Sequence, residues 1–421
     1  MKKLCIILLL LCTQVANSFP TVTEINPAIY SLMQQVDIDS LEAKIRYLQD
    51  LGPRTRISYW LGPDSNSFQN NIAAKNWLHQ QYLDIGNLDV YFHHFLPNEP
   101  FGEFYDSAMN VVAVQKGTVY PDEYIIVCGH FDTALNTPGA DDNASGTSGV
   151  SEIARVLSPH YFKRSIIYLN TNGEERGISG ASIFAHYCRA NNINILGVFN
   201  LDMIGYNPID KPLTMFYANF PDNLHTHTHR AFAKYFGDVA NLYLPDIPAM
   251  LGADGGAGDC TMFNMNDYIA MYIGDILGRK YFEYMHPCYH QGCDIIGIGK
   301  EYAGVNSMEL VKAYTQATLA AIAELAELDF DSIEYEKMIN CFLSPNPTNS
   351  TVTMTLHLKD VGNLTVTLNN ILSQELFEIY SGFVDAKIFT KTFSMEALPK
   401  GVYYLKISHN GKMQMEKVIK K

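Results

Sequence analysis

Between residues 40 and 330 the sequence alternates short apolar runs with amphipathic stretches, and this alternation constrains the fold more than any other feature. The apolar runs have the length of strands and include 125–128, 166–169, 195–201 and 268–273. Helical patterns lie between them, for example over 149–157, 181–190 and 308–328. This order predicts an α/β fold, a three-layer sandwich around a mixed, mostly parallel sheet. In such sheets, ligands bind beyond the carboxyl ends of the strands.

The pattern changes near residue 340, where a turn-rich run occupies 344–350 (SPNPTNS). Two period-two faces follow, one of Val352, Met354, Leu356 and Leu358 and one of Leu364, Val366 and Leu368. Residues 401–407 predict a further strand, which Asn410-Gly411 turns into a last one. Residues 341–421 hold nine Lys and no Arg against six acids, whereas the whole chain has a net charge of −14. We therefore expect a separate, small all-β sandwich.

The first eighteen residues have the three parts of a secretory signal peptide. A basic start at Lys2-Lys3 is followed by an apolar run over 4–12 and by a small-x-small pattern that predicts cleavage after Ser18. A lipoprotein anchor at Cys12 is the alternative, but Leu11 stands where such a site needs a small residue. The apolar run is far shorter than the roughly 20 residues that span a bilayer. We expect no transmembrane segment in the mature chain.

The overall charge also limits the partners. An acidic chain with a net charge of −14 repels phosphates, so we expect no nucleic-acid partner. Six cysteines remain after the signal peptide. Cys128 lies inside an apolar run and is predicted to be a buried thiol. A disulfide is plausible among three loop cysteines, Cys260, Cys288 and Cys293.

Ionisable side chains follow the apolar runs, at the points where the predicted strands end. They are His130 and Asp132, then Asp142, Glu174 and Glu175, Asp202, and finally His290 with Asp294. Because the carboxyl ends of parallel strands meet at one edge of a sheet, we expect these side chains to gather there. Without cations so many carboxylates would repel one another, and some would take up protons. Two divalent ions would neutralise them, so the sequence predicts a binuclear metal site.

The donor types indicate which metal is bound. Imidazole and carboxylate together favour Zn²⁺, at two ions per chain, since Mg²⁺ and Ca²⁺ prefer sites made of oxygen alone. Two metals about 3.5–4 Å apart polarise a carbonyl and hold a nucleophilic water at the same time. The adjacent pair Glu174-Glu175 suits a division of labour in which one residue binds metal and the other acts as a base.

Five motifs, in this order, resemble those of the co-catalytic zinc aminopeptidases of the bacterial leucyl aminopeptidase family. The motifs are His130-x-Asp132, 139–146 (GADDNASG), Glu174-Glu175, 201–203 (LDM) and His290-x-x-x-Asp294. The same superfamily includes glutamate carboxypeptidases and glutaminyl cyclases. The resemblance covers roughly residues 40–330, and it implies a zinc exopeptidase domain over residues 19–335.

The resemblance also implies roles for single residues. His130 and Asp202 would bind one zinc, Glu175 and His290 the other, and Asp142 would bridge both. The implied reaction is hydrolysis of the N-terminal peptide bond of peptide substrates by a metal-activated water.

Two further residues of these motifs, Glu174 and Asp132, would act without binding metal. The resemblance gives Glu174 the role of general base, which later returns the proton to the leaving amine. Asp132 would orient His130 through its second ring nitrogen.

Some positions depart from the family or leave a choice open. Some relatives have an oxyanion-binding Tyr and a Ser-Asp-His near a glycine-rich loop, whereas the loop 251–260 has no Tyr and no His after Asp259. Asp259 either lines the site or caps the loop. His286 precedes His290 by four residues and could compete with it as a ligand. The motif favours His290, because Asp294 follows it at the required spacing.

The C-terminal part resembles the sorting domain of the type nine secretion system of Gram-negative bacteria. The matching features are Pro345-Asn346-Pro347, 398–404 (LPKGVYY) and 417–421 (KVIKK). The resemblance implies a partner in the outer-membrane secretion machinery and a secreted or cell-surface protein that passes through the periplasm. An accessory carbohydrate-binding or adhesive domain is the alternative, although exposed Trp clusters are missing from this sequence. The expected boundaries are a signal peptide at 1–18, the zinc domain at 19–335, a linker at 336–350 and the sandwich at 351–421.

Three other functions remain beside the aminopeptidase. A glutaminyl cyclase on the same fold works with one zinc and does not need His130 as a ligand. A carboxypeptidase or dipeptidase on the same fold is a further alternative. A non-catalytic metal-binding protein is disfavoured, because Glu174 is present together with all five predicted ligands.

Overall fold

The structure is a computed structural model of the whole chain. It describes residues 19–55, 66–94, 109–206, 213–218, 223–253, 258–274, 286–296, 301–302, 306–329, 339–358, 360–370, 375–410 and 412–421. The predicted signal peptide lies outside the described residues, as do positions 254–257 of the glycine-rich loop.

A mixed eight-stranded sheet runs through the α/β part, in the order β1-β2-β4-β3-β5-β8-β6-β7. β3 pairs in parallel with β4 and β5, β5 with β8, and β6 with β7. The other pairs, β1–β2, β2–β4 and β6–β8, are antiparallel. The strands are β1 (Asp89–His94), β2 (Met109–Gln115), β3 (Tyr120–His130), β4 (Arg164–Thr171), β5 (Asn194–Leu201), β6 (Leu213–Tyr217), β7 (Ala249–Ala253) and β8 (Ala270–Ile273). The predicted three-layer α/β class is confirmed.

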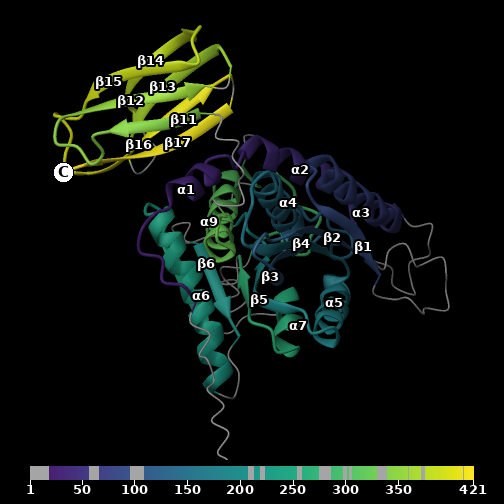
Figure 1. Cartoon of the computed structure of the whole chain (residues 1–421). Coiled ribbons are helices and arrows are strands. Elements are labelled where there is room, and N and C mark those ends of the chain that lie inside the picture. The colour runs from purple at the N-terminus through teal and green to yellow at the C-terminus, as the bar shows by residue number, and fades with distance from the viewer. Residues whose placement is uncertain are drawn as a thin grey trace, which may run out of the picture.

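Helices cover both faces of the sheet. Successive strand residues point to opposite sides, so the continuous apolar runs present apolar side chains on both faces. In β3, Ile125 and Val127 belong to one buried cluster, whereas Ile126 and Cys128 belong to the other. The first cluster packs against α1 (Pro27–Met33), α2 (Ile38–Asp50), α3 (Asn66–Ile85), α4 (Gly146–Leu157), α6 (Asn223–Tyr243) and α9 (Met308–Ala326). The second packs against α5 (Ser179–Ala190) and α7 (Asp259–Met265), which lie together in Figure 1. Cys128 is a buried free thiol, as predicted.

A fully paired ion cluster, here named the Glu152 cluster, joins α2 to α4. The Glu152 carboxylate accepts hydrogen bonds from Lys44 Nζ at 2.6 Å, from Arg155 at 2.6 and 3.0 Å, from Ser40 Oγ at 2.9 Å and from the Asp37 amide at 2.9 Å. Burial raises the pKa of Glu152, but the hydrogen bonds and charges of Arg155 and Lys44 outweigh it and lower that pKa to about 2.

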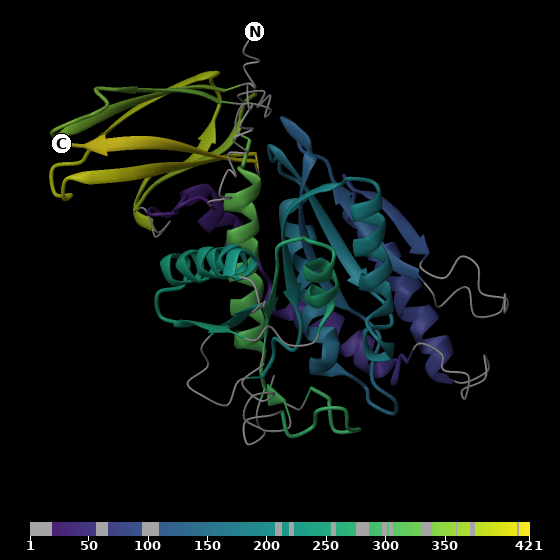
Figure 2. The ribbon, with the colours of Figure 1, turned by 90° about the horizontal axis from the view of Figure 1, so that it is seen from below.

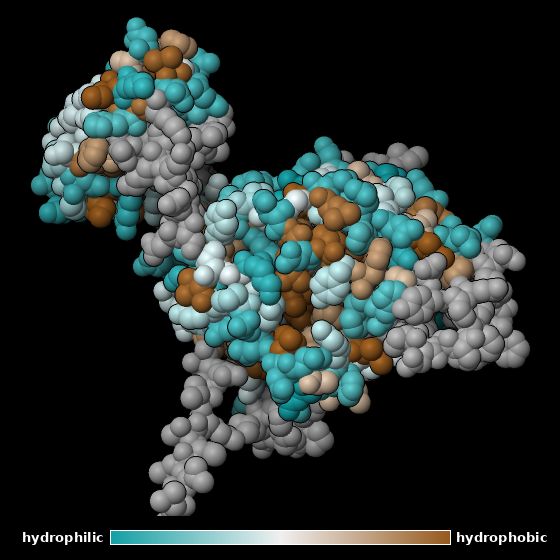
Figure 3. Space-filling view, turned by 45° about the vertical axis from the view of Figure 1, so that its right-hand side comes forward, coloured by the Kyte–Doolittle hydropathy of each residue, from teal (hydrophilic) through white to brown (hydrophobic). Residues whose placement is uncertain are grey.

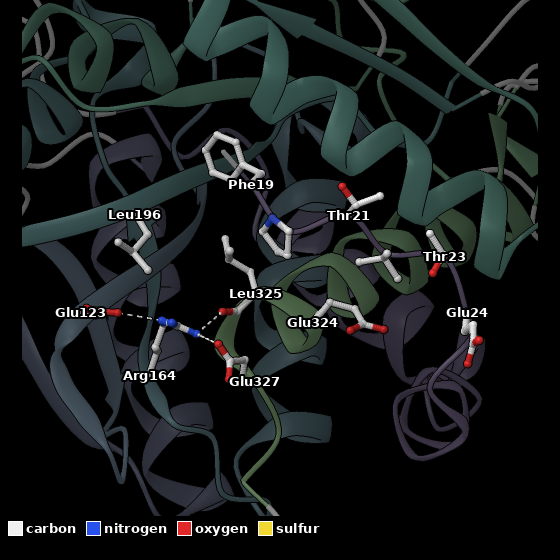
Figure 4. A pocket seen from close by; sticks show the side chains of 12 residues that line it. Phe19, Thr21, Thr23, Glu24, Glu123, Arg164, Leu196, Glu324, Leu325 and Glu327 are labelled. Atoms are coloured by element: carbon white, nitrogen blue, oxygen red, sulfur yellow. Dashed lines mark hydrogen bonds and ion pairs between the residues drawn. The ribbon is translucent and has the colours of Figure 1, made fainter. Parts of the chain in front are cut away.

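A cavity of about 670 Å³ lies at the end of the sheet where the parallel strands begin. Arg164 at the start of β4 crosses its floor and binds Glu123 of β3 and Glu327 beyond α9, as Figure 4 shows. The N-terminal segment 19–24 forms another wall. Tyr243 of α6 accepts from the Asn26 amide at 2.9 Å and donates to Glu324, which links the chain just after this segment to α9.

The described residues of 339–421 form two antiparallel sheets, of order β11-β12-β15 and β14-β13-β16-β17, which pack on a shared apolar core. The predicted inward faces of 352–358 and 364–368 are buried there. The strands are β11 (Ile339–Ser344), β12 (Thr351–Leu358), β13 (Gly362–Asn369), β14 (Glu375–Val384), β15 (Ile388–Ser394), β16 (Gly401–His409) and β17 (Lys412–Lys420). β11 pairs with β12 although it falls within the expected linker at 336–350, so the β structure begins earlier than the proline-rich run suggested.

The two parts are also distinct in surface view (Figure 3), and Figure 2 shows the sandwich at the side of the larger α/β body. Hydrophobic residues gather in a band on the visible face of that body, surrounded by hydrophilic ones. Within the described ranges no helix has both the length and the apolar character needed to cross a membrane.

Candidate metal centre

The carboxyl ends of β3 and β5 place the first three site residues together. His130 is the last residue of β3, and Asp202 follows β5 directly. His130 Nε2 lies 3.3 Å from Asp142 Oδ1 and 3.4 Å from Asp202 Oδ1. All three side chains are buried, and one ligand atom from each lies within 4.8 Å of the others. They form a group that could hold a metal ion.

A second group shares Asp142 and is more open to solvent. His290 Nε2 lies 3.2 Å from Asp142 Oδ2 and 3.2 Å from Glu175 Oε1. The His290 side chain is 38% exposed, whereas that of His130 is 1% exposed. The two oxygens of Asp142 thus face different groups, which is the arrangement expected of a carboxylate that bridges two ions.

The Asp142 segment is held in place by its neighbours in space. Gly139 begins it with a φ of 60°, and a Cβ there would lie 2.3 Å from the Asp142 carbonyl oxygen, so the turn needs glycine. Asn143 donates from its side chain to the Leu201 carbonyl at 2.9 Å, which joins the segment to the end of β5. The Asp294 carboxylate accepts from the amides of Asp141 and Asp142 at 2.8 and 3.1 Å.

The His290 loop is closed by a disulfide between Cys288 and Cys293. This bridge is one of those expected among the loop cysteines, and Cys260, which is buried, is not part of it. The Tyr289 ring stacks on the His290 ring with centroids 3.8 Å apart. Because Asp294 belongs to the same loop, the bridge and the Asp294 contacts restrain the loop on both sides of His290.

Asp132 lies behind the first group, and its carboxylate joins two motifs. It accepts from the backbone amides of Glu174 and Glu175 at 3.1 and 3.2 Å, so it fixes the turn that follows β4. Its Oδ1 lies 3.5 Å from His130 Nδ1, and its carbonyl oxygen lies 3.1 Å from the same nitrogen. These contacts leave His130 Nε2 directed toward Asp142 and Asp202.

The pKa values show that the cluster lacks positive charge. Burial lowers the pKa of His130, yet hydrogen bonds to Asp132, Asp142 and Asp202 outweigh it and raise that pKa well above its ordinary value. The pKa of His290 is raised to about 10, since Asp142 and Glu175 outweigh the effect of burial. In the absence of any other cation, the surrounding carboxylates thus favour the protonated form of each imidazole.

The pKa values of two carboxylates of the site, Glu174 and Glu175, are raised as well. Burial and neighbouring negative charges raise the pKa of Glu174 well above its ordinary value, and burial with Asp142 raises that of Glu175 to about 7. Buried carboxylates in excess of their cations call for further positive charge. Each group offers imidazole nitrogen and carboxylate oxygen, the donor combination that suits zinc.

Other residues that the sequence analysis considered near the site do not belong to either of the two groups. His286 is buried, and its Nε2 lies 3.9 Å from Asp141 Oδ2. Asp141 accepts from the Gly205 amide at 2.8 Å and is not part of either group. Asp259 is the first residue of α7, is fully buried and accepts from Thr171, and burial raises its pKa to about 7. It lies near enough to His130 and Asp202 to interact with them electrostatically.

Sequence reasoning missed Arg54, a fully buried cation beside the metal-site loops. Its only sequence signal is an Arg after Gly52-Pro53, two residues before Arg56, in a region with no motif.

Comparison with known families agrees with this geometry. Peptidase family M28 matches residues 110–313, the stretch that contains both metal groups. Residues 110–313 are an M28 peptidase domain. Residues 343–421 match the secretion system C-terminal sorting domain, so the C-terminal sandwich is a sorting domain.

Curated relatives of the M28 domain include a protein of Pyrenophora teres f. teres described as a probable zinc metalloprotease. It is 28% identical over 202 residues, which cover 44% of this chain and 43% of that protein. The chain thus matches less than half the length of this relative.

Solved structures share the fold. The LapA aminopeptidase of Legionella pneumophila aligns with a TM-score of 0.57 and 19% identity, over 74% of this chain and 78% of that one. An aminopeptidase from Aneurinibacillus sp. strain AM-1 aligns with a TM-score of 0.54 and 14% identity, over 72% of this chain and 97% of that one.

Proposed function

We propose that this protein is a zinc-dependent aminopeptidase, which hydrolyses the N-terminal peptide bond of peptides. One observation supports this most: two groups of imidazole and carboxylate donors share Asp142 at the carboxyl ends of the strands of an M28 domain. A shared carboxylate between two such groups suits a pair of ions rather than one.

His130, Asp142 and Asp202 would hold one zinc ion, and Asp142, Glu175 and His290 the other. Bound zinc supplies electrophilic activation of the scissile carbonyl and of a water molecule. Asp132 keeps His130 in the tautomer with a free Nε2, because its oxygens accept a hydrogen bond from the Nδ1–H of His130. The greater exposure of the second group makes it the side from which substrate arrives.

Glu174 acts as the general base in this proposal. It follows β4 beside Glu175, and the Asp132 carboxylate fixes its backbone. A carboxylate whose pKa is raised by burial accepts a proton from water more readily and then passes it to the leaving amine. The Glu174 carboxylate thus carries one proton from the attacking water to the leaving amine.

The test measures zinc content and turnover of purified mature protein. We expect two zinc ions per chain and hydrolysis of aminoacyl-p-nitroanilides. The same substrates should be cleaved only slowly when their N-terminus is acetylated. About one zinc with cyclisation of N-terminal Gln would indicate a glutaminyl cyclase. Cleavage from the carboxyl end would indicate a carboxypeptidase, and no turnover of any peptide would contradict the enzyme proposal.

We also propose export. The sorting domain at 343–421 would direct the protein to the outer-membrane secretion machinery, and the segment 1–18 would be its signal peptide. The mature protein would then act outside the cell or on its surface. Deleting residues 343–421 should leave the protein in the periplasm of a host that has the secretion system.

A further inference from the structure

Arg54 is a buried charge that no motif accounts for. It lies in the loop after α2 and has an exposure of 0%. Buried arginines usually pair with a carboxylate, but the hydrogen-bond acceptors of this guanidinium are backbone carbonyl oxygens. They are Phe131 O at 2.9 Å, Leu48 O at 2.6 Å, Pro138 O at 2.6 Å, Gly139 O at 3.0 Å and Gly52 O at 3.4 Å.

Three of these carbonyls belong to the loops that present metal-site residues. Phe131 lies between His130 and Asp132, so Arg54 Nε holds the chain directly after β3. Pro138 and Gly139 lead into the Asp142 segment, and they accept from Nη1 and Nη2. One planar group therefore spans both loops with bonds in fixed directions.

The other contacts anchor Arg54 itself. Leu48 O is in the last turn of α2, where carbonyls lack helical partners, and Arg54 supplies the missing donor. The Arg54 amide donates to Thr133 Oγ1 at 2.9 Å, and its carbonyl accepts from Asn71 of α3 at 2.7 Å. The guanidinium is thus fixed to α2 and α3 on one side and to the site loops on the other.

Its charge also faces the site. Asp294, Asp132 and Asp142 all interact with the guanidinium electrostatically. Of these, Asp142 belongs to both metal groups, and Asp294 holds the Asp142 amide. Arg54 thus combines a geometric link to the loops with a positive charge close to the shared carboxylate.

We propose that Arg54 is a positioning residue for the metal centre, which sets the spacing between the His130 and Asp142 loops and so tunes zinc affinity. This inference rests on the proposed zinc function. It differs from a purely structural role, because a structural anchor would stabilise the apo and zinc-loaded protein alike.

The experiment titrates zinc into the apo forms of wild type, Arg54→Lys and Arg54→Met, with a chromophoric chelator as competitor. Loss of a residue that orients ligands commonly costs about 10–100-fold in metal affinity. We expect about 10-fold weaker zinc binding for Arg54→Lys, which keeps a charge but not the fork of donors, and up to about 100-fold for Arg54→Met. The rise in melting temperature on adding zinc should shrink in the same order.

Lys44→Met is the matched control. Lys44 is also a buried cation of the α2 region, but its partner Glu152 lies on α4 and is not a metal-site residue. Its loss should lower the melting temperatures of apo and zinc-loaded protein equally and leave zinc affinity unchanged. Wild-type affinity in both Arg54 variants would overturn the proposal, as would an equal loss of affinity in Lys44→Met.

If the Arg54 variants do not fold, hydrogen exchange of the wild-type protein tests whether Arg54 links α2 to the metal-site loops. Zinc should slow exchange in the segment 44–55 as well as in 131–143, because Arg54 connects them; protection of 131–143 alone would refute the link. The two proposals fail separately. If wild type binds zinc tightly but hydrolyses no peptide, only the proposed activity is contradicted. If wild type is active and the Arg54 variants bind zinc with wild-type affinity, only the proposed role of Arg54 is contradicted.

Discussion

Two clusters of buried charge lie within the same α/β part, and they are built on different principles. In the Glu152 cluster one carboxylate meets two cations and two further donors, and its pKa falls to about 2. In the metal centre carboxylates outnumber imidazoles, the pKa of Glu175 rises to about 7 and that of His290 to about 10. A cluster that is complete without a ligand is structural, whereas one with surplus carboxylate is suited to binding cations.

The largest effect should come from the shared carboxylate. Asp142→Asn should remove most of both zinc ions and all measurable turnover, because Asp142 belongs to both groups. His130→Ala and His290→Ala should each keep about one zinc per chain, since each changes one group only. Atomic absorption on dialysed protein measures this. Equal zinc loss in all three variants would contradict the bridging role of Asp142.

The next effect separates chemistry from metal binding. Glu174→Gln should lower kcat by about 10²–10⁴-fold while two zinc ions remain bound, because it removes the proposed proton carrier. Glu152→Gln is the control with the same chemical change in the other cluster. It should leave kcat and zinc content unchanged. Near-normal turnover of an aminoacyl-p-nitroanilide by Glu174→Gln would show that another group is the base.

The Glu152 cluster should respond in stability instead. Glu152→Ala leaves Lys44 buried without its carboxylate partner, and breaking a buried ion pair on one side costs about 3–5 kcal/mol. Urea unfolding of the zinc-loaded protein gives this value. A decrease in the free energy of unfolding of less than about 1 kcal/mol, the range of solvent-exposed ion pairs, would show that solvent screens this cluster.

Acid should weaken the Glu152 cluster over a defined range. Its pKa is about 2 in the folded chain and 4.5 in the reference state, so the unfolded chain binds more protons between these values. The stabilisation is complete above about pH 4.5 and is lost as the pH falls toward 2, with an upper limit of about 3 kcal/mol. Unfolding of apo wild type and apo Glu152→Gln at several pH values measures it. Equal pH dependence of the two would contradict the assignment.

Much of the fold was predictable because its signals are local. A continuous apolar run predicts the strand around 125–128 and an alternating apolar face predicts the strand around 352–358, and the apolar residues of both are buried as expected. The five predicted ligands could be identified because each follows a strand end or belongs to a motif, and the structure brings them into two groups. Their role as zinc ligands remains a proposal.

Other features have no local signal. Arg54 acts through backbone carbonyls, which every residue possesses, so nothing in the sequence of 131 or 138–139 marks them as its partners. β11 falls within the expected linker at 336–350, because the turn-rich run that begins at Ser344 predicts a linker there, yet residues 339–344 pair with the neighbouring strand β12. The raised pKa of Asp259 depends on its burial, which the sequence around a single residue does not reveal.

The cavity walls at the start of the parallel strands have one more consequence. The segment after residue 18 and the end of α9 both lie there, whereas His130 and Asp202 lie at the opposite ends of β3 and β5. Whatever is attached before Phe19, and the sorting domain that follows α9, therefore join the molecule away from the two groups that could hold metal ions. A leader or a surface tether joined there would attach at the opposite end of the strands from His130 and Asp202.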